Sequence, residues 1–273
     1  DKFDEFKTYT QESSIKVVGK VVQNERAPGG YEVLIQDIEL YHLSVDYPIT
    51  PKDHGTDFLM NNRHLWLRSK RQHAILKIRH RIIKATRDFF DNNEFTLIDT
   101  PIFTPNSAEG TTTLFETEYF GKMAYLAQTG QLYGEASAMS FGRHYNFGPC
   151  FRAEKSKTRR HLTEFWMVEP EIAFCDIDED IQWAEDLLVY IVKEVLESCI
   201  EHLQVLDRDI SVLEKSISPF PRISYTDALE IIHNAVKRKK LKVKVLPKWS
   251  DDLGSTCEKY LAEKHFGLPI MVY

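Results

Sequence analysis

The chain has 273 residues, which is enough for one large domain and a smaller one, and its 42% hydrophobic and 28% charged residues are ordinary for a soluble globular protein. No apolar run approaches the roughly 20 residues of a membrane-spanning helix, and four widely spaced cysteines without a C-x-x-C pair indicate neither a zinc site nor a disulfide framework, so we expect a cytoplasmic protein. The net charge of −6 excludes a globally basic protein, and a nucleic-acid partner would have to meet local clusters of Lys and Arg.

Residues 1–45 alternate in the manner of short strands and are predicted to form a small β domain. Residues 15–22 predict one strand with a possible bulge at Gly19, and residues 28–30 (Pro-Gly-Gly) predict a turn before a second strand that starts at residue 31. Residues 46–70 are rich in Pro, His and Arg and are predicted to form a polar hinge, which leaves residues 71–273 for the main domain.

Residues 79–103 predict an amphipathic helix followed by a strand. The helix should break at residues 91–93 (Asp-Asn-Asn), and the chain should continue as a strand that stops at Pro101. The apolar side chains at helical spacing are Ile75, Ile78, Ile82 and Phe89. An ordinary helix packed on a sheet would show the same periodicity, so this segment alone indicates no function.

Two features between residues 104 and 140 suggest a binding site. Small and hydroxylated residues surround Glu109, a composition that favours a mobile lid over a packed element. Residues 126–133 then predict a strand that turns into a helix at Gly130.

Residues 148–174 predict two apolar strands joined by a charged loop, an antiparallel pair whose loop could lie over a polyanion. Arg152, at the end of the first strand, presents a fork of donors that suits a carboxylate or phosphate. Glu154 follows two residues later, is expected on the same side of the strand, and can only accept hydrogen bonds. Phe165 offers a ring on which a nucleobase could stack. Together these residue types predict a nucleotide site.

The C-terminal third predicts helices and one strand. Residues 181–206 predict a long amphipathic helix whose apolar stripe belongs to the core, and Ser224 or Thr226 should cap another helix. The cationic run at residues 237–244 is most simply a solvated helix end, and residues 268–273 begin a strand.

The pattern Phe-Arg-x-Glu at residues 151–154, followed by Arg-His-x-x-Glu-Phe at 160–165, resembles the second signature motif of the class II aminoacyl-tRNA synthetases, and more narrowly of their aspartyl/asparaginyl subgroup. Residues 79–103 resemble the first motif, which forms the dimer interface in that family. Residues 46–69 are similar to the connector between the two domains of the asparaginyl enzymes, and residues 1–45 look like the later half of an OB-fold. The resemblance implies an α+β fold, with an antiparallel sheet flanked by helices in residues 71–273 and a partial OB-fold barrel, the anticodon-binding module of that family, before it.

Residues 129–135 (Thr-Gly-Gln-Leu-Tyr-Gly-Glu) are similar to the asparaginyl pattern Ser-Gly-Gln-Leu-Tyr followed by Glu, whereas the aspartyl enzymes carry Ser-Pro-Gln-Leu. A carboxylate beside the substrate side chain accepts hydrogen bonds from a carboxamide but repels another carboxylate. We therefore interpret Glu135 as a determinant of asparagine over aspartate, against the simpler reading of a solvated helix residue.

The resemblance implies ATP-dependent attachment of L-asparagine to tRNA(Asn) through an asparaginyl-adenylate, by a homodimer formed through residues 75–103. Mg²⁺ would accompany ATP and keep mostly phosphate and water ligands, so no metal-ligating residue is assigned. The implied catalytic residues are Arg152 and Glu154. The implied ATP-binding residues are Arg152, Glu154, Arg160, His161, Leu162 and Phe165, and the implied amino-acid-binding residues are Glu109, Gln131, Glu135 and Glu169.

The third class II motif does not occur in these residues, because no Gly-x-Gly-x-x-x-Arg pattern is present. We therefore expect the chain to be a fragment or to be completed by further residues, and expect that it can be inactive alone. Three alternatives stay open: a non-discriminating aspartyl-tRNA synthetase, an asparagine synthetase on the same catalytic fold, and a non-catalytic nucleotide- or RNA-binding paralogue. The OB-like module argues against the second, and only the absent third motif supports the last.

Overall fold

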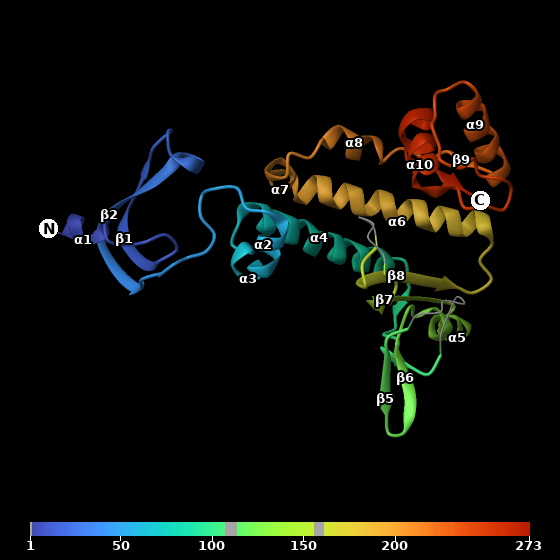
Figure 1. Ribbon diagram of the computed structural model, residues 1–273, viewed down its shortest axis with the longest axis horizontal. Helices are drawn as coiled ribbons and strands as arrows, with labels where there is room; N and C mark the ends of the chain where they lie inside the picture. Colours follow the sequence, from blue (N-terminus) through green and yellow to red (C-terminus); the bar gives the residue numbers. More distant parts are fainter. Residues whose placement is uncertain (1, 107–113, 156–160) are drawn as a thin grey trace. The chain divides into compact units, whose positions relative to one another are not determined.

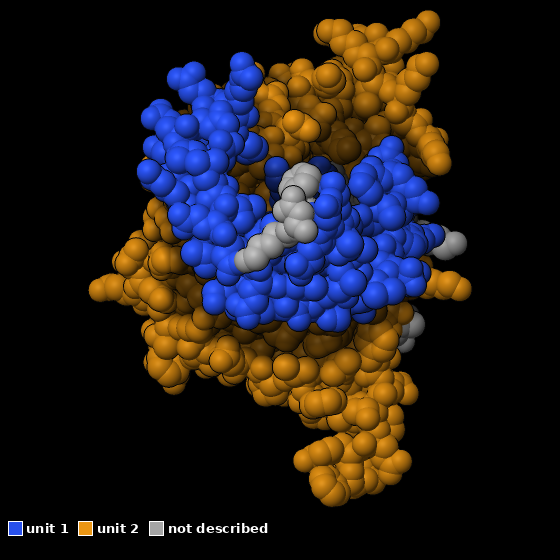
Figure 2. Space-filling view, turned by 90° about the vertical axis from the view of Figure 1, so that its left-hand side faces the viewer, with its two compact units in different colours: residues 1–73 blue, residues 74–273 orange. Residues whose placement is uncertain are grey.

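The computed structural model describes residues 2–106, 114–155 and 161–273. It divides into two compact units, residues 1–73 and 74–273, which are coloured separately in Figure 2. The first unit contains α1 (Lys2–Phe6), β1 (Ser14–Gln23), the short 3₁₀ turn η1 (Pro28–Gly30), β2 (Tyr31–His42), α2 (Thr56–Asn61) and α3 (Arg63–Trp66). The assignment of residues 1–45 to a partial OB-fold stays a prediction.

Strands β1 and β2 form one antiparallel pair, as the alternation in residues 14–42 predicts. The register shifts between Val18 and Gly19, which confirms the expected bulge. Glycine is required there because a Cβ on Gly19 would lie 2.4 Å from the carbonyl oxygen of Leu34. Most apolar side chains of the two strands are exposed within their unit.

The second unit is built on the long helices α4 (Lys70–Asn92) and α6 (Ile177–Ser198), which lie beside a three-stranded sheet (Figure 1). The sheet has the order β3–β7–β8, with β3 at Thr96–Leu97, β7 at Arg143–Phe151 and β8 at Glu164–Ile172. The antiparallel β7–β8 pair confirms the two strands predicted for residues 148–174. Aromatic side chains from α4, β7 and α6 fill the core between these elements. They are Phe89, Phe90, Phe95, Tyr145, Phe147, Trp183 and Tyr190.

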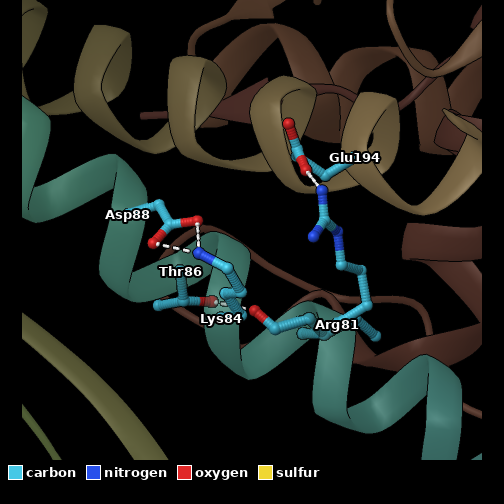
Figure 3. Close-up of polar contacts among 6 residues, drawn as sticks. Arg81, Lys84, Thr86, Asp88 and Glu194 are labelled. Carbon is cyan, nitrogen blue, oxygen red and sulfur yellow. Dashed lines mark hydrogen bonds and ion pairs between the residues drawn. The ribbon is translucent and has the colours of Figure 1, made fainter. Parts of the chain in front are cut away.

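An ion pair between Arg81 of α4 and Glu194 of α6 joins the two long helices (Figure 3). Both side chains are mostly buried, with exposed fractions of 29% and 20%. Lys84 and Asp88 form a second pair at 2.5 Å, but both belong to α4 and are more exposed. Only the first pair therefore bears on how α4 and α6 pack.

The strand predicted to stop at Pro101 is found as the short β3 at Thr96–Leu97, which ends before the proline. Beyond Pro101 the chain forms another short strand in a different sheet, β4 at Phe103–Thr104, which was not predicted. The physical reason for the stop is Pro101, which has no N–H to donate and cannot continue a ladder. The chain therefore leaves β7 after the bond from Ile98 N–H to the Tyr145 carbonyl, and joins another sheet beyond the proline.

The second sheet has the order β4–β6–β5, with β5 at Glu116–Tyr119 and β6 at Lys122–Leu126. Ala127, just after β6, connects this sheet to the first. Its N–H donates to the Ile102 carbonyl at 2.8 Å, and its carbonyl accepts from the Phe151 N–H at 2.9 Å. Helix α5 (Gln131–Phe141) begins after Gly130, as the sequence predicts, and packs on β7 and β8.

The helix predicted for residues 181–206 is two helices, α6 and α7 (Ile200–Val205), because Cys199 has a non-helical φ of −128°. After α8 (Ile210–Lys215), a C-terminal lobe has its own apolar core. The lobe contains β9 (Arg222–Ile223), α9 (Tyr225–Lys237), α10 (Gly254–Lys259), the π-helix η2 (Tyr260–Phe266) and β10 (Met271–Val272). Ser224 caps α9 by accepting the Asp227 N–H at 3.1 Å, which confirms the predicted cap.

Candidate active site

Arg152 and Phe165 meet at the open end of the β7–β8 pair. Phe165 lies opposite Cys150 in the register, and Arg152 extends the ladder by donating its backbone N–H to the Thr163 carbonyl at 3.0 Å. The Arg152 guanidinium carbon lies 5.5 Å from the centre of the Phe165 ring, within the range of a cation–π contact. Both side chains are half-buried, so an anion-binding fork and a stacking ring share one position, as the residue types predicted.

The structure does not bring Glu154 onto the same strand face as Arg152. Strand β7 ends at Phe151, and residues 152–155 have no regular secondary structure, so strand alternation does not orient Glu154. Glu154, His161 and Leu162 are exposed. Glu109 and Arg160 lie outside the described residues.

Glu169 is a buried carboxylate that accepts hydrogen bonds from three residues in two segments of the chain. The Gly130 N–H donates to both carboxylate oxygens at 3.1 Å, the Asn146 side-chain amide donates to Oε2 at 3.0 Å, and the Thr129 hydroxyl donates to Oε1. Cys150 Sγ makes a longer contact of 3.9 Å. The carboxylate therefore fixes the turn from which α5 starts, and that turn carries the other predicted amino-acid-binding residues.

Gln131 and Glu135 lie one turn apart on α5, and the Gln131 side-chain amide donates to Glu135 Oε1 at 3.0 Å. Gln131 is half-buried and Glu135 is exposed. The backbone N–H of Gln131 also donates to the Thr129 hydroxyl at 3.0 Å, which orders the start of the helix. The structure thus connects Gln131, Glu135 and Glu169 at one end of α5.

Sequence reasoning missed His144, which is fully buried on β7 opposite Glu171 of β8. Neither ring nitrogen of His144 has a hydrogen-bond partner within the described residues. Burial lowers the pKa of this imidazole, so it is held neutral. Helix α5 passes close by at Gly134, where a Cβ would lie 2.8 Å from His144 Nε2.

Two further groups were also missed, the half-buried Glu171 and the buried Cys150. Burial, with the nearby acids Glu135, Glu169 and Asp180, raises the pKa of Glu171. Burial and the Glu169 carboxylate raise the pKa of the Cys150 thiol to about 12, so this cysteine is not a nucleophile at neutral pH. Asn146 and His144 lie opposite Glu169 and Glu171 because of the β7–β8 register, which cannot be read from a single sequence.

The arrangement offers an anion fork, a stacking ring, an amide and several acceptors, but no activated nucleophile. Such a set binds and orients a nucleotide and a small polar substrate. Within residues 2–106, 114–155 and 161–273, no group of three or more His, Cys, Asp or Glu side chains is placed to hold a metal ion. In the same residues no helix has both the length and the apolarity to cross a membrane.

Comparison with known proteins identifies a family. The model of the class II tRNA synthetases (D, K and N) matches residues 55–266. The asparagine–tRNA ligase of Sorangium cellulosum is 53% identical over 269 residues, which are 97% of this chain and 60% of that protein. The asparagine–tRNA ligase of Koribacter versatilis is 50% identical, over 99% of this chain and 61% of that protein. The chain thus spans about 60% of the length of these curated relatives.

Solved structures agree with this likeness. The asparaginyl-tRNA synthetase of Pyrococcus horikoshii, complexed with asparaginyl-adenylate, aligns with a TM-score of 0.91 and 36% identity, over 100% of this chain and 61% of that one. The asparaginyl-tRNA synthetase of Entamoeba histolytica, in complex with the same adenylate, aligns with a TM-score of 0.83 and 25% identity, over 98% of this chain and 61% of that one.

Proposed function

The chain belongs to the class II tRNA synthetases (D, K and N), and we propose that it serves the ATP-dependent attachment of asparagine to tRNA(Asn). The observation that carries the choice of asparagine is the hydrogen-bonded pair of Gln131 and Glu135, held at the start of α5 by the buried Glu169 carboxylate. These groups offer acceptors to a carboxamide NH₂, and their negative charge would repel the carboxylate of aspartate.

In the proposed first step, a carboxylate oxygen of asparagine attacks the α-phosphorus of ATP, forms a P–O bond and expels pyrophosphate. In the second step, a terminal ribose hydroxyl of the tRNA attacks the carbonyl carbon of the adenylate and expels AMP. Neither step needs a protein nucleophile, because orientation and charge stabilisation lower the barriers. A mechanism without a protein nucleophile fits a site in which the buried Cys150 thiol is held protonated.

Arg152 is assigned to the junction between the substrate carboxylate and the α-phosphate, since its fork can bind both anions. Phe165 is assigned to the adenine, whose stacking face it would offer once the ring contact with Arg152 rearranges. Glu154 would accept from the adenine amino group, and Arg160, His161 and Leu162 would line the phosphates and the base.

Binding of the amino-acid substrate is assigned to Glu109, Gln131, Glu135 and Glu169. Glu169 already accepts from Thr129, Gly130 and Asn146, so its contribution to the substrate ammonium group is mainly its negative charge. Mg²⁺ would shield the phosphate charges of ATP, but the described residues include no donor set for it, and no step is assigned to the metal.

We also propose that the protein is a homodimer through residues 75–103 and that residues 1–45 are part of an OB-fold that meets the anticodon. The dimer is supported by exposed apolar side chains in that segment, among them Leu76, Ile82, Ile102 and Phe103. The anticodon contact is supported by the antiparallel β1–β2 pair with its bulge at Gly19.

The decisive test is ATP–pyrophosphate exchange with asparagine and aspartate offered in parallel. In a chain extended to the full length of its relatives, exchange with asparagine alone is expected, and Arg152→Gln should reduce it by at least about 100-fold because a charge-stabilising contact is lost. Lys193→Gln, which removes an exposed cation of α6, is the matched control and should change little. Exchange with aspartate alone would overturn the substrate assignment, and absence of exchange in a chain extended to the full length of its relatives would overturn the reaction.

A further inference from the structure

The C-terminal lobe carries a dense cationic segment that the proposed site does not use. Residues 237–248 contain seven Lys or Arg side chains and no Asp or Glu, in a chain whose net charge is −6. All seven are exposed, and the segment is anchored to the lobe core by the buried Leu241 and the half-buried Val243. The seven are Lys237, Arg238, Lys239, Lys240, Lys242, Lys244 and Lys248.

The charges of this segment are not neutralised by the fold. Across the described parts of the chain, no ion pair or hydrogen bond involves the side chain of any of the seven, although the Asp251 carboxylate accepts from the backbone N–H of Lys248 at 2.8 Å. Two acids of α9, Asp227 and Glu230, lie earlier in the same helix, more than one turn before Lys237. An unpaired cluster of this density repels itself, and a bound polyanion would relieve that repulsion.

Lys239 occupies a backbone position that normally belongs to glycine. Its φ is +58°, and it lies just after the end of α9. Its N–H donates to the Val236 carbonyl and the Lys240 N–H donates to the Ala235 carbonyl, both at 2.9 Å, which is the hydrogen-bond pattern of a helix C-terminus that favours Gly in the left-handed region. The chain therefore places a cation where the fold alone would favour glycine.

Arg238 and Lys240 line a hollow of about 230 Å³ between α9 and η2. Asn234, Tyr260 and His265 also line it and supply further polar groups. Tyr260 and His265 come from a seven-residue π-helix, a rare conformation that is frequent at functional sites. Two cations and several hydrogen-bonding groups around a small hollow suit a phosphate group.

We propose that this surface, residues 237–248 with the hollow beside η2, binds the phosphate backbone of RNA. The inference deepens the proposed function, on which it rests, by assigning part of the tRNA contact to the C-terminal lobe. RNA is favoured over an anionic membrane because the hollow is concave and polar, whereas a flat lipid surface would not enter it. The exposed Trp249, at 71%, adds a ring on which a base can stack beside the cations.

The test is binding of tRNA(Asn) transcript, measured by fluorescence anisotropy at several salt concentrations. The triple variant Arg238→Gln, Lys239→Gly, Lys240→Gln should bind about 10-fold more weakly at moderate salt, with a log–log salt slope smaller by about 2.7, since it removes three cations and each lost phosphate contact removes about 0.9. A control with the same charge loss elsewhere, Lys122→Gln, Lys193→Gln, Lys215→Gln, should keep the wild-type slope. Unchanged affinity and slope in the first variant would overturn the proposal.

The single variant Lys239→Gly separates binding from folding. It should raise the melting temperature, because glycine tolerates φ of +58°, and should still weaken tRNA binding. A raised melting temperature with unchanged tRNA affinity would count against the proposal. The proposal would also fail if the triple variant lost binding to vesicles that contain anionic lipid but bound tRNA as tightly as the wild-type chain.

Pyrophosphate exchange distinguishes this proposal from the proposed function. The triple variant should exchange with asparagine like the wild-type chain, because no residue of the cluster belongs to the candidate active site. If a full-length chain shows no exchange but binds tRNA through the cluster, the proposed reaction fails and the RNA surface stands. If exchange is intact and the triple variant binds tRNA like the wild-type chain, the proposed reaction stands and the RNA surface fails.

Discussion

Asn146 is the residue on which the order of the Glu169 carboxylate most visibly depends, because its amide donates to Oε2 at 3.0 Å in a buried setting. We expect Asn146→Ala to lower the free energy of unfolding by about 1.5–3 kcal/mol, the usual range for losing a hydrogen bond to a charged group. Asn146→Asp should cost more, because two buried carboxyl groups would then face each other. Urea unfolding at pH 7 measures both. A smaller effect of Asp than of Ala would show that Glu169 does not depend on this donor.

Gly134 and His144 form a steric pair that can be tested by a double-mutant cycle. Gly134→Ala would place a Cβ 2.8 Å from His144 Nε2, so we expect a loss of about 1–3 kcal/mol of stability from overpacking. Combining it with His144→Ala removes the obstacle, and the cost of the alanine at 134 should then largely disappear. Thermal or urea unfolding of the four chains gives the coupling energy. Additive costs would mean that α5 has room to move away from β7.

The sequence predicts the residues of the candidate site whose chemistry is visible in their type, namely Arg152 with Phe165 and Gln131 with Glu135. It does not predict Asn146, His144 or Glu171, because their importance arises from the β7–β8 register, which sets Asn146 opposite Glu169 and His144 opposite Glu171. It also assumes that Glu154 belongs to the strand, because nothing in the residue pattern shows that β7 ends at Phe151.

At the scale of elements, α4 and α6 are joined by the Arg81–Glu194 pair, whereas Lys84–Asp88 stays within α4. A double-mutant cycle on Arg81 and Glu194 should give a coupling of roughly 1–2 kcal/mol, because the pair is mostly buried and charge-assisted. The cycle on Lys84 and Asp88 should give about 0.3–0.5 kcal/mol, as for other pairs one turn apart. Equal couplings would mean that the contact between the helices adds nothing to their packing.

Helix and strand prediction succeeds where side-chain periodicity decides the element and fails where one residue interrupts it. Helix α4, the β1 bulge and the Ser224 cap were predictable from such local signals. The stop at Pro101 was also predictable, but the strand β4 beyond it was not, because nothing in residues 102–104 shows that they pair with a different sheet. The break at Cys199 between α6 and α7 was not predictable either, because the sequence has no Gly or Pro at that point.

At the scale of the whole molecule, the buried His144 and the half-buried Glu171 make stability change with pH in opposite directions. The pKa of His144 is lowered below 6.5 in the folded chain, so the unfolded chain binds more protons just below that pH, and stability should fall as the pH drops from 6.5. The pKa of Glu171 is raised above 4.5, so the folded chain binds more protons just above that pH, and stability should fall as the pH rises from 4.5.

Urea unfolding between pH 4.5 and 7 separates the two contributions. The variant His144→Asn should lose stability less steeply than the wild-type chain as the pH falls from 6.5. The variant Glu171→Gln should gain most, relative to the wild-type chain, at the upper end of the range, where the Glu171 carboxyl must ionise beside Glu135, Glu169 and Asp180. Parallel curves for all three chains would mean that neither group titrates differently on folding.

Ala127 has a consequence for how the second unit opens to solvent. Its N–H donates to Ile102 beside one sheet, and its carbonyl accepts from Phe151 in the other sheet. If either sheet frays at that point, the hydrogen bond to the other sheet is therefore exposed to solvent as well. In native-state hydrogen exchange the amides of Ala127 and Phe151 should therefore share one opening free energy and respond equally to denaturant. Strand β7, which ends at Phe151, and the strands β4 and β6 would then behave as one cooperative unit, although they belong to two sheets.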